Sequence, residues 1–538
     1  MQQHQRQSVT RDDARRRLRW NGCSQNIPAR RKPPPSREIK SGEEPKSMQQ
    51  NTTDGANVGL HARWSWRLLG LVAILALVNF VVDSAIGAPL IVLPEMLDHF
   101  GTDQAAWLNA TAMLAGVMWA PLLGKSADIY GKRRVLVLTL LISCVGALIC
   151  AVAPTMWIFV IGRMLQGAAL AALFLSVAIV RTVCTPRLAM IIVGIVTTGT
   201  AILNVASRFL IEKLAMEFGF QVLFLISAAV AVAMAACVRF LVPESLVKTP
   251  GRLDISGALL LGGGLLGVLG YISMGPELGW SAPGPLGLLL GGVVALVRWF
   301  TVSSRKADPL IDVGNLGKPL LLTLLVVFLG AGSYQSMLQL IPLISDVSAD
   351  QNLGYGLGGH GSVALLLAAP AVGVMLGGPV AGWLGTRIGP ARTLAGAVML
   401  GTVATIGMFL GAFQLVAALC FAFLLGVTVA ALGASGFNMA GNSASAQRQG
   451  IVSSLVMVMV STGAVVFNFV GAAVLASTTV VANGETVNSA TGVFSYIAIA
   501  TAAFAIAAVV VVLLVRTTHP QRPMPAPELE PQAVETRA

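Results

Sequence analysis

Residues 124–136 read GKSADIYGKRRVL and lie between two long apolar runs. An acid at a helix end, a glycine turn and a cluster of cations can together form a charge-locked latch, which holds two groups of helices in one arrangement and releases them in another. An ordinary basic loop would show the same spacing, so both interpretations stay open here. The residues of the predicted latch are Gly124, Asp128, Gly131, Lys132, Arg133 and Arg134.

The chain around this segment is strongly apolar. Of its 538 residues 55% are hydrophobic and 11% are charged, and the mean hydropathy is +0.77. Average soluble proteins carry about 25% charged residues, and a soluble protein of this size could not cover its surface with so few. The composition therefore excludes a water-soluble enzyme and predicts an all-α polytopic membrane protein. At roughly 32 residues per crossing and connection, residues 66–516 hold about fourteen helices.

Lysine and arginine occur in alternate connections between the apolar runs, and only Arg208 and Lys213 depart from this pattern. Residues 477–492, for example, form an expected connection without any basic residue. By the positive-inside rule both termini are cytoplasmic and the number of spans is even. Twelve or fourteen spans would satisfy the rule, and the apolar runs favour fourteen. We therefore expect a multi-pass protein of the cell membrane, meaning an inner or plasma membrane.

The first 65 residues form a basic tail, with thirteen Lys and Arg against six acidic residues. They contain too few apolar residues to fold, so we expect a disordered cytoplasmic segment beside anionic lipid and no nucleic-acid binding. No part of the tail resembles the hydrophobic region of a cleavable signal peptide. Met48 opens MQQNTTDG much as Met1 opens MQQHQ, which raises residue 48 as an alternative start of the native chain.

Cysteines and histidines are scattered along the chain. The six cysteines occur singly, and the five histidines lie in tails or expected loops. Metal sites need clustered ligands, and hydrolase triads need a serine, a histidine and an acid at one depth in the membrane. We therefore expect no metal, no cofactor and no enzymatic activity.

Two ionisable residues fall inside predicted spans. Arg163 lies within an apolar run, where a charge costs at least ~2.5 kcal/mol, so it should face the protein interior or a water-filled cavity. Asp83 is the only acid deep in the first span, and Asn79 lies on the same helical face. The alternative is that Asp83 merely reaches a loop. Arg208 and Glu212 on the fifth span allow two interpretations. Either they form a local ion pair, or Arg208 is a cationic group in the outward cavity that contacts substrate.

Several motifs resemble the major facilitator superfamily. Residues 124–134 match its cytoplasmic loop signature, and Arg163, Gln166 and Gly167 match its fourth-helix signature. The further matches are Trp107, Val242-Pro243-Glu244-Ser245 and Arg252-x-Asp254-x-x-Gly257. The two additional spans before residue 318 are similar to those of the fourteen-span drug:proton antiporter branch.

The resemblance implies two pseudo-symmetric six-helix bundles around a central cavity that opens alternately to each side. The expected parts are a tail at 1–65, an N-terminal bundle at 66–245, two extra helices with a linker at 246–317, a C-terminal bundle at 318–516 and a tail at 517–538.

The same resemblance implies secondary active export of hydrophobic or amphipathic small molecules, exchanged for protons. Asp83 would accept the proton, and Arg163 would compete for the carboxylate and help to release the proton. We expect a monomer whose partners are the substrate, protons and the lipid bilayer. Helix-to-helix hydrogen bonding is the alternative role of each candidate amide. The candidate cavity residues are Asn79, Gln166, Arg208, Gln335, Gln339, Asn438, Asn442 and Asn468.

Two departures from the family keep other functions open. The fifth span lacks the Gly-Pro-x-x-Gly-Gly signature of the exporter branch, and Thr386 stands where the second-half repeat of the loop signature would have an acid. Only the first half should therefore hold a strong latch. The alternatives are a permease or lipid-like solute transporter that is not coupled to protons, and a membrane sensor or scaffold that transports nothing.

Overall fold

The computed structural model describes residues 64–517 apart from short gaps. The gaps are 87–88, 90–91, 102–104, 245–252, 307–316, 346, 348–353, 358–362, 446–447 and 483–484. The two predicted tails and the alternative start at Met48 lie outside the described residues, except for the tail residues next to the first and last helices.

The described chain is almost entirely helical, as the composition predicts. Helices satisfy all their backbone hydrogen bonds internally, which a segment surrounded by lipid requires. The first half contains α2 (Trp66–Ile86), α3 (Leu93–Phe100), α4 (Ala105–Tyr130), α5 (Lys132–Val152), α6 (Met156–Gln166), the 3-10 turn η2 (Gly167–Ala169), α7 (Leu170–Val183), α8 (Pro186–Thr198), α9 (Ala201–Phe218) and α10 (Gln221–Leu241). The remainder contains α11 (Ile255–Leu278), α12 (Pro283–Ser303), α13 (Lys318–Ser345), α14 (Val363–Ile388), α15 (Pro390–Gly411), α16 (Leu415–Asn442), α17 (Gln449–Ser477), β1 (Thr479–Ala482), β2 (Glu485–Asn488) and α18 (Ala490–Thr517).

Twelve helices among the described residues are long and apolar enough to cross a membrane, where α6, η2 and α7 count as one. The 26-residue α4 and the pair formed by α8 and α9 are not among these twelve. The count of fourteen spans and the cytoplasmic position of the termini therefore stay predictions.

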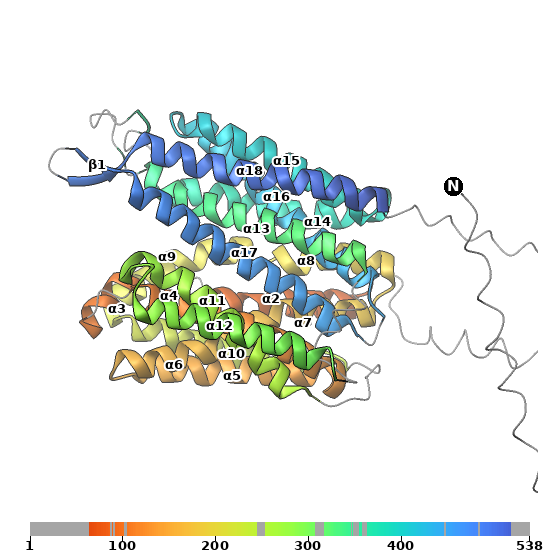
Figure 1. Ribbon diagram of the computed structural model, residues 1–538. Coiled ribbons are helices and arrows are strands. Elements are labelled where there is room, and N and C mark those ends of the chain that lie inside the picture. Colours follow the sequence, from red (N-terminus) through yellow and green to blue (C-terminus); the bar gives the residue numbers. More distant parts are fainter. Residues whose placement is uncertain are drawn as a thin grey trace, which may run out of the picture. The chain divides into compact units, whose positions relative to one another are not determined.

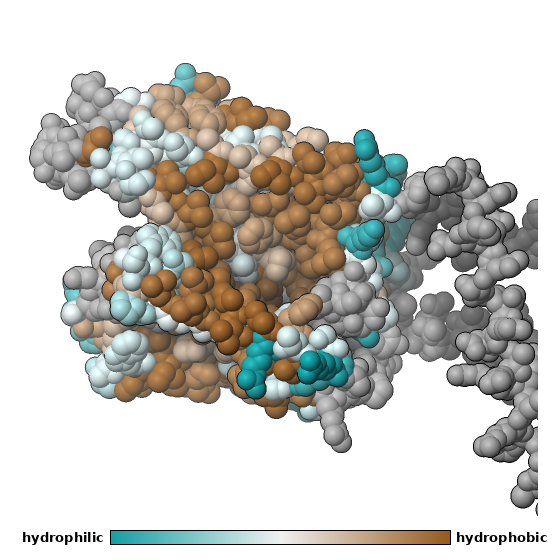
Figure 2. All heavy atoms as spheres, viewed as in Figure 1, coloured by the Kyte–Doolittle hydropathy of each residue, from teal (hydrophilic) through white to brown (hydrophobic). Residues whose placement is uncertain are grey.

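The helices form two groups that meet along α4, α7, α8, α14, α16 and α17 (Figure 1). In the first group, α5 packs on α10 and α2 packs on α10, α7 and α8. In the second, α16 packs on α14 and α15, and α13 packs on α17 and α18. Figure 2 shows hydrophobic residues over the faces of both groups and hydrophilic residues gathered toward the helix ends. This distribution fits a protein whose middle is surrounded by lipid.

The extra helices α11 and α12 are central in the sequence but peripheral in space. They pack against each other, and α11 lies on α4 and also touches α17. Only 11% of the apolar window of α12 is buried inside the protein. The two groups of helices are therefore in direct contact, and the hairpin of α11 and α12 flanks them.

The start of α11 explains the Asp254-x-x-Gly257 part of the motif quoted above. The Asp254 carboxylate accepts a hydrogen bond from the Gly257 N–H at 2.8 Å, and it also accepts from Lys306 at the end of α12. Burial by itself raises the pKa of Asp254, but the hydrogen bonds from Lys306, Gly257 and Ser256 outweigh it and hold this pKa below its usual value. The ionised cap therefore stabilises the hairpin above the unfolded pKa of about 3.9, and this stabilisation is lost as the pH falls through the lower folded pKa.

A short hairpin follows α17 in the segment that we expected to be an irregular connection. Strands β1 and β2 pair antiparallel, with Val480 opposite Val487. The Tyr355 hydroxyl donates a hydrogen bond to the Asn488 carbonyl at 2.7 Å, which ties the hairpin to the connection between α13 and α14. The β-branched residues Thr479, Val480, Val481, Thr486 and Val487 favour strands in this connection.

Close contact between α8 and α14 provides a test of this packing. A Cβ at Gly194 would meet the carbonyl group of Gly378 and would lie 2.7 Å from its carbon, which the backbone of α14 cannot avoid by a rotamer change. We expect Gly194→Ala to cost about 1–3 kcal/mol through overpacking. The matched control is Gly396→Ala in α15, because nothing lies within 4 Å of a Cβ there. Melting temperatures in detergent should fall for the first variant and stay level or rise for the second; equal values would contradict the close contact.

Candidate functional site

The end of α4 is bound to the beginning of α17 through the carboxylate of Asp128. Its two oxygens accept hydrogen bonds from the backbone N–H groups of Gly450 at 2.9 Å and Ile451 at 3.0 Å. The first N–H groups of a helix have no partner within the helix, and the helix dipole favours a negative charge there. Asp128 is buried, so this charge is held where water screens it little. One side chain of the first half thus caps a helix of the second half.

A glycine one turn earlier allows this approach. A Cβ at Gly124 would lie 2.8 Å from the Cβ of Ser454 and 2.9 Å from the carbonyl oxygen of Gly450. Any larger residue would push α4 away from α17 and lengthen the hydrogen bonds of Asp128. Gly124 therefore has a packing reason for its place in the signature.

The turn after α4 returns the chain so that α5 begins beside the same carboxylate. Gly131 has φ of +109°, a left-handed region that favours glycine. The next residue, Lys132, is fully buried, and its Nζ lies 3.5 Å from Asp128 Oδ1. The ammonium group compensates the buried carboxylate, and removing either partner would leave an uncompensated charge.

The other two cations of the segment bind within the first half. The backbone N–H of Arg133 donates to Glu244 Oε1 at 3.2 Å, and its guanidinium donates to the Val242 carbonyl at 3.2 Å. The Nε atoms of Arg133 and Arg134 lie 3.5 Å and 3.6 Å from Glu244 Oε2. Because Glu244 follows α10, these contacts fix the start of α5 to the end of α10. The structure thus brings the predicted latch residues together near Asp128 and Glu244. Gly124 and Asp128 contact α17 of the second half, whereas the contacts described for Arg133 and Arg134 lie within the first half.

A second contact between the halves involves Arg181 near the end of α7, one of the basic residues that occur in alternate connections. Its guanidinium donates to the carbonyl of Asn438 at 2.8 Å, to the side chain of Asn438 at 2.9 Å and to the side chain of Asn442 at 3.1 Å. Arg181 belongs to α7, whereas both asparagines lie at the end of α16. A cation is favourable at a helix C-terminus for the same reason that an anion is favourable at an N-terminus.

These contacts form what we call the α16–α17 clamp: Asp128 on the first N–H groups of α17, and Arg181 on the last turn of α16. The two helix ends have opposite partial charges, and the first half supplies the complementary charge to each. Asn438 and Asn442 were predicted as cavity residues, with helix-to-helix hydrogen bonding as the alternative. In the structure both accept hydrogen bonds from Arg181 of α7, which is the alternative role. Their spacing of four on one helical face was the only signal in the sequence that they act together.

Arg163 lies in the protein interior, on the face of α6 that turns toward α2 and α4. Its side chain is fully buried and donates hydrogen bonds to the carbonyls of Leu108 at 3.2 Å and Ala85, and to Gln166 Oε1 at 2.9 Å. Ala85 follows Asp83 by two residues in α2. The Asp83 side chain lies outside the described residues, so its distance from Arg163 is undefined. The guanidinium nevertheless reaches the part of α2 to which Asp83 belongs.

The remaining predicted cavity residues are spread over several helices. Asn79 is buried and donates to the Val196 carbonyl at 2.7 Å, which joins α2 to α8. Gln335 is half-buried and Gln339 is exposed, both on α13. Asn468 on α17 has a buried Oδ1 without a hydrogen-bond partner in the described part of the chain. The Arg208 and Glu212 side chains on α9 lie outside the described residues, so the choice between a local ion pair and a substrate contact stays open.

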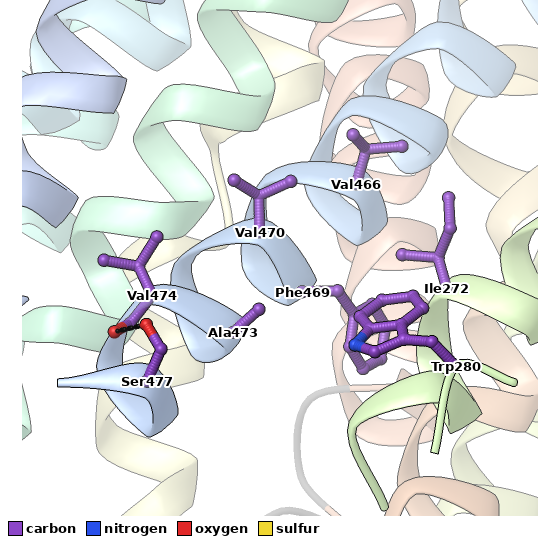
Figure 3. A pocket seen from close by; sticks show the side chains of 8 residues that line it. All are labelled: Ile272, Trp280, Val466, Phe469, Val470, Ala473, Val474 and Ser477. Carbon is purple, nitrogen blue, oxygen red and sulfur yellow. Dashed lines mark hydrogen bonds between the residues drawn. The ribbon is translucent and has the colours of Figure 1, made fainter. Parts of the chain in front are cut away.

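An apolar groove runs between α17 and the end of α11 (Figure 3). Its volume is about 450 Å³, within the range of small-molecule sites. The rings of Trp280 and Phe469 lie next to each other at one end of the groove. This groove could not be predicted from the sequence, because the apolar residues that line it resemble the other apolar residues of a membrane helix. The lining residues are Ile272, Trp280, Val466, Phe469, Val470, Ala473, Val474 and Ser477.

In the described ranges, no group of three histidines, cysteines or acids is placed to hold a metal ion. The polar groups described above are held by backbone carbonyls and by one another. These polar groups bind helices to one another, both within the first half and between the two halves.

The clamp can be tested by removing its negative charge. We expect Asp128→Ala to separate the ends of α4 and α17, because it leaves the N–H groups of α17 and the buried Lys132 without their partner, a loss of about 3–5 kcal/mol. Spin labels at the exposed positions Tyr130 and Arg448, in a cysteine-free background, should report a longer and broader distance distribution. Glu244→Gln is the matched control, since the contacts described for Glu244 join the beginning of α5 to the end of α10, and both elements belong to the first half. An unchanged distribution in Asp128→Ala would show that the clamp does not hold the halves together.

Comparisons with known proteins agree with this architecture. Among solved structures, the human organic anion transporter MFSD10 (TETRAN) superposes with a TM-score of 0.54 at 16% identity, over 84% of this chain and 99% of that one. At this identity the likeness supports the fold alone.

Relatives of similar sequence are transporters with different named substrates. They include a uridine/deoxyuridine transporter of Lactococcus lactis (28% identical, covering 60% of this chain and 68% of the relative) and a multidrug resistance protein B homolog of Mycobacterium tuberculosis (27%, 66% and 64%). A triacylglyceride transporter of Mycolicibacterium hassiacum is 28% identical over 52% of each chain. The matched segments thus span about half to two thirds of these relatives.

The family model described as Major Facilitator Superfamily matches residues 75–468 and 349–536, which together include both groups of helices. With its membrane-spanning helices and its transporter relatives, this multi-pass membrane protein belongs to the Major Facilitator Superfamily of transporters.

Proposed function

We propose that this protein exports hydrophobic or amphipathic small molecules from the cell in exchange for protons. The observation that carries the proposal is the position of Arg163, a fully buried cation whose guanidinium reaches the end of α2 beside Asp83. A charge inside a membrane protein is expensive to keep, and such residues mark ion or proton pathways. Asp83 is the proton acceptor in this proposal.

The clamp supplies the other part of the mechanism. With Asp128 and Arg181 bound to the ends of α17 and α16, the two halves are joined at one end, while Figure 2 shows the surface hollowed between them at the end where β1 lies. In our proposal the joined end is cytoplasmic, so this arrangement faces outward. Asp83 then takes up a proton from outside, and the halves separate at the clamp. Arg163 next attracts the carboxylate, and the proton leaves toward the cytoplasm.

The available energy is sufficient for export. One proton that enters through a potential of ~100 mV and a difference of one pH unit releases roughly 2.3 plus 1.4 kcal/mol. This energy supports a substrate gradient of several hundredfold. No nucleotide or further cofactor is needed to drive transport of a neutral substrate.

The groove between α11 and α17 supports an apolar cargo. Its walls are almost entirely hydrocarbon and aromatic, with Ser477 at one end, so a charged solute would lose its hydration there without compensation. The multidrug and triacylglyceride relatives both have names that indicate apolar cargo, whereas the uridine transporter does not.

A second candidate function is transport of a lipid-like solute without proton exchange. The lateral position of the groove favours it, since a molecule dissolved in the bilayer could enter between α11 and α17 without passing through water. This candidate predicts transport that ignores an imposed pH gradient. A sensor or scaffold predicts no transport at all.

Transport measurements on proteoliposomes separate these candidates. We expect a pH gradient to drive accumulation of a neutral fluorescent amphipathic compound or a fluorescent acylglycerol by the wild-type protein. Asp83→Asn should abolish the gradient-driven part, because an amide cannot carry the proton, while the melting temperature stays near that of the wild type.

The matched control is Asp98→Asn, which removes an exposed carboxylate on α3 and should transport normally. Gradient-driven transport that persists in Asp83→Asn would remove Asp83 from the mechanism. Accumulation by the wild-type protein that ignores the gradient would favour the uncoupled lipid-like transporter instead.

A further inference from the structure

A small basic cavity lies between the beginning of α5 and the end of α10. Its volume is about 200 Å³, and its lining consists of Arg133, Arg134, Val137 and Arg239. The two helices pack directly on each other, so the cavity is built on rigid elements. It lies apart from the apolar groove and from Arg163.

The charge in this cavity is unbalanced. Three arginines against the single carboxylate of Glu244 leave a local net charge of +2. Glu244 lies within ion-pair distance of both Arg133 and Arg134, but the side chains of Arg134 and Arg239 remain exposed and accessible to an anion. The N-terminus of α5 adds the positive end of a helix dipole. An anion with several oxygen atoms would complete the hydrogen bonding of these guanidinium groups.

An exposed apolar stripe begins where the cavity ends. Leu138, Leu141 and Val145 follow Arg134 along α5 at spacings of four, three and four residues, which places all of them on one helical face. Their side chains are 50%, 44% and 51% exposed, so none of the helices that the structure describes covers this face. On a membrane-spanning helix, such a face contacts the hydrocarbon chains of lipids.

We propose that this cavity binds the phosphate of an anionic phospholipid headgroup from the cytoplasmic leaflet. The guanidinium groups of Arg134 and Arg239 bind the phosphate oxygens, and an acyl chain lies along the stripe from Leu138 to Val145. The positive-inside rule assigns this end of α5 to the cytoplasm, where anionic lipids attract basic residues at the membrane surface. The stripe favours a lipid over a soluble phosphate, because only a lipid has an acyl chain that can pack against it.

Native mass spectrometry of the full-length protein in detergent tests the proposal. The probes are dioleoyl phosphatidylglycerol, dioleoyl phosphatidylcholine and glycerol 3-phosphate. We expect phosphatidylglycerol to bind more tightly than either of the other two. The double variant Arg134→Gln with Arg239→Gln should weaken its binding by about thirtyfold, since each basic residue near an anionic lipid contributes a factor of about five.

The matched control is Arg298→Gln with Arg305→Gln, which removes two exposed arginines from the end of α12, outside any cavity described here. Its affinity for phosphatidylglycerol should change by less than about twofold. The proposal is overturned if the two double variants weaken binding equally, if Arg134→Gln with Arg239→Gln binds as the wild type does, or if glycerol 3-phosphate binds as tightly as the lipid. Melting temperatures check that each variant is folded, and no transport measurement enters the test.

Discussion

The arrangement of the two halves depends on one carboxylate that caps a helix of the opposite half. Asp128 accepts hydrogen bonds from the first N–H groups of α17, and Arg181 donates to the last turn of α16. These two helix ends of the second half thus bind opposite charges of the first half. The hydrogen bonds of Asp128 are buried, so water screens this charge little, whereas those of Arg181 are partly exposed. A clamp made of helix ends can therefore close firmly and still open as a unit, which packed apolar surfaces alone would not allow.

The interior charges of the first half have separate tasks because their surroundings differ. Lys132 is paired with Asp128 and serves the contact between the halves, whereas Arg163 is bound mainly by backbone carbonyls and by Gln166. The guanidinium of Arg163 thereby links α6 to α4 and to the end of α2 inside the first half, whereas the ammonium group of Lys132 lies beside the contact between the halves.

The added helices α11 and α12 change the edge of the protein more than its centre. Helix α11 packs on α4 and α17 without separating the two groups of helices, and the apolar groove forms where α11 meets α17. Helix α17 consequently takes part in the clamp at its beginning and in the groove near its end. A rotation that frees its first turn from Asp128 must also move the groove, which links the two features mechanically.

The sequence by itself determined the membrane fold, the interior position of Arg163 and the gathering of charges around Asp128, because burying charges and unpaired backbone groups costs so much that few arrangements remain. Asp128 and Gly124 were recognisable since a helix end, a turn and a close approach each demand particular residue types. Only the tertiary structure decided the partners of Asp128, the role of Arg181 with Asn438, the outer position of α11 and α12, the strands in the last connection and the apolar groove. Those features arise between segments hundreds of residues apart, or from apolar side chains that resemble all others in a membrane helix, and no local pattern in the sequence records which helix will pack against which.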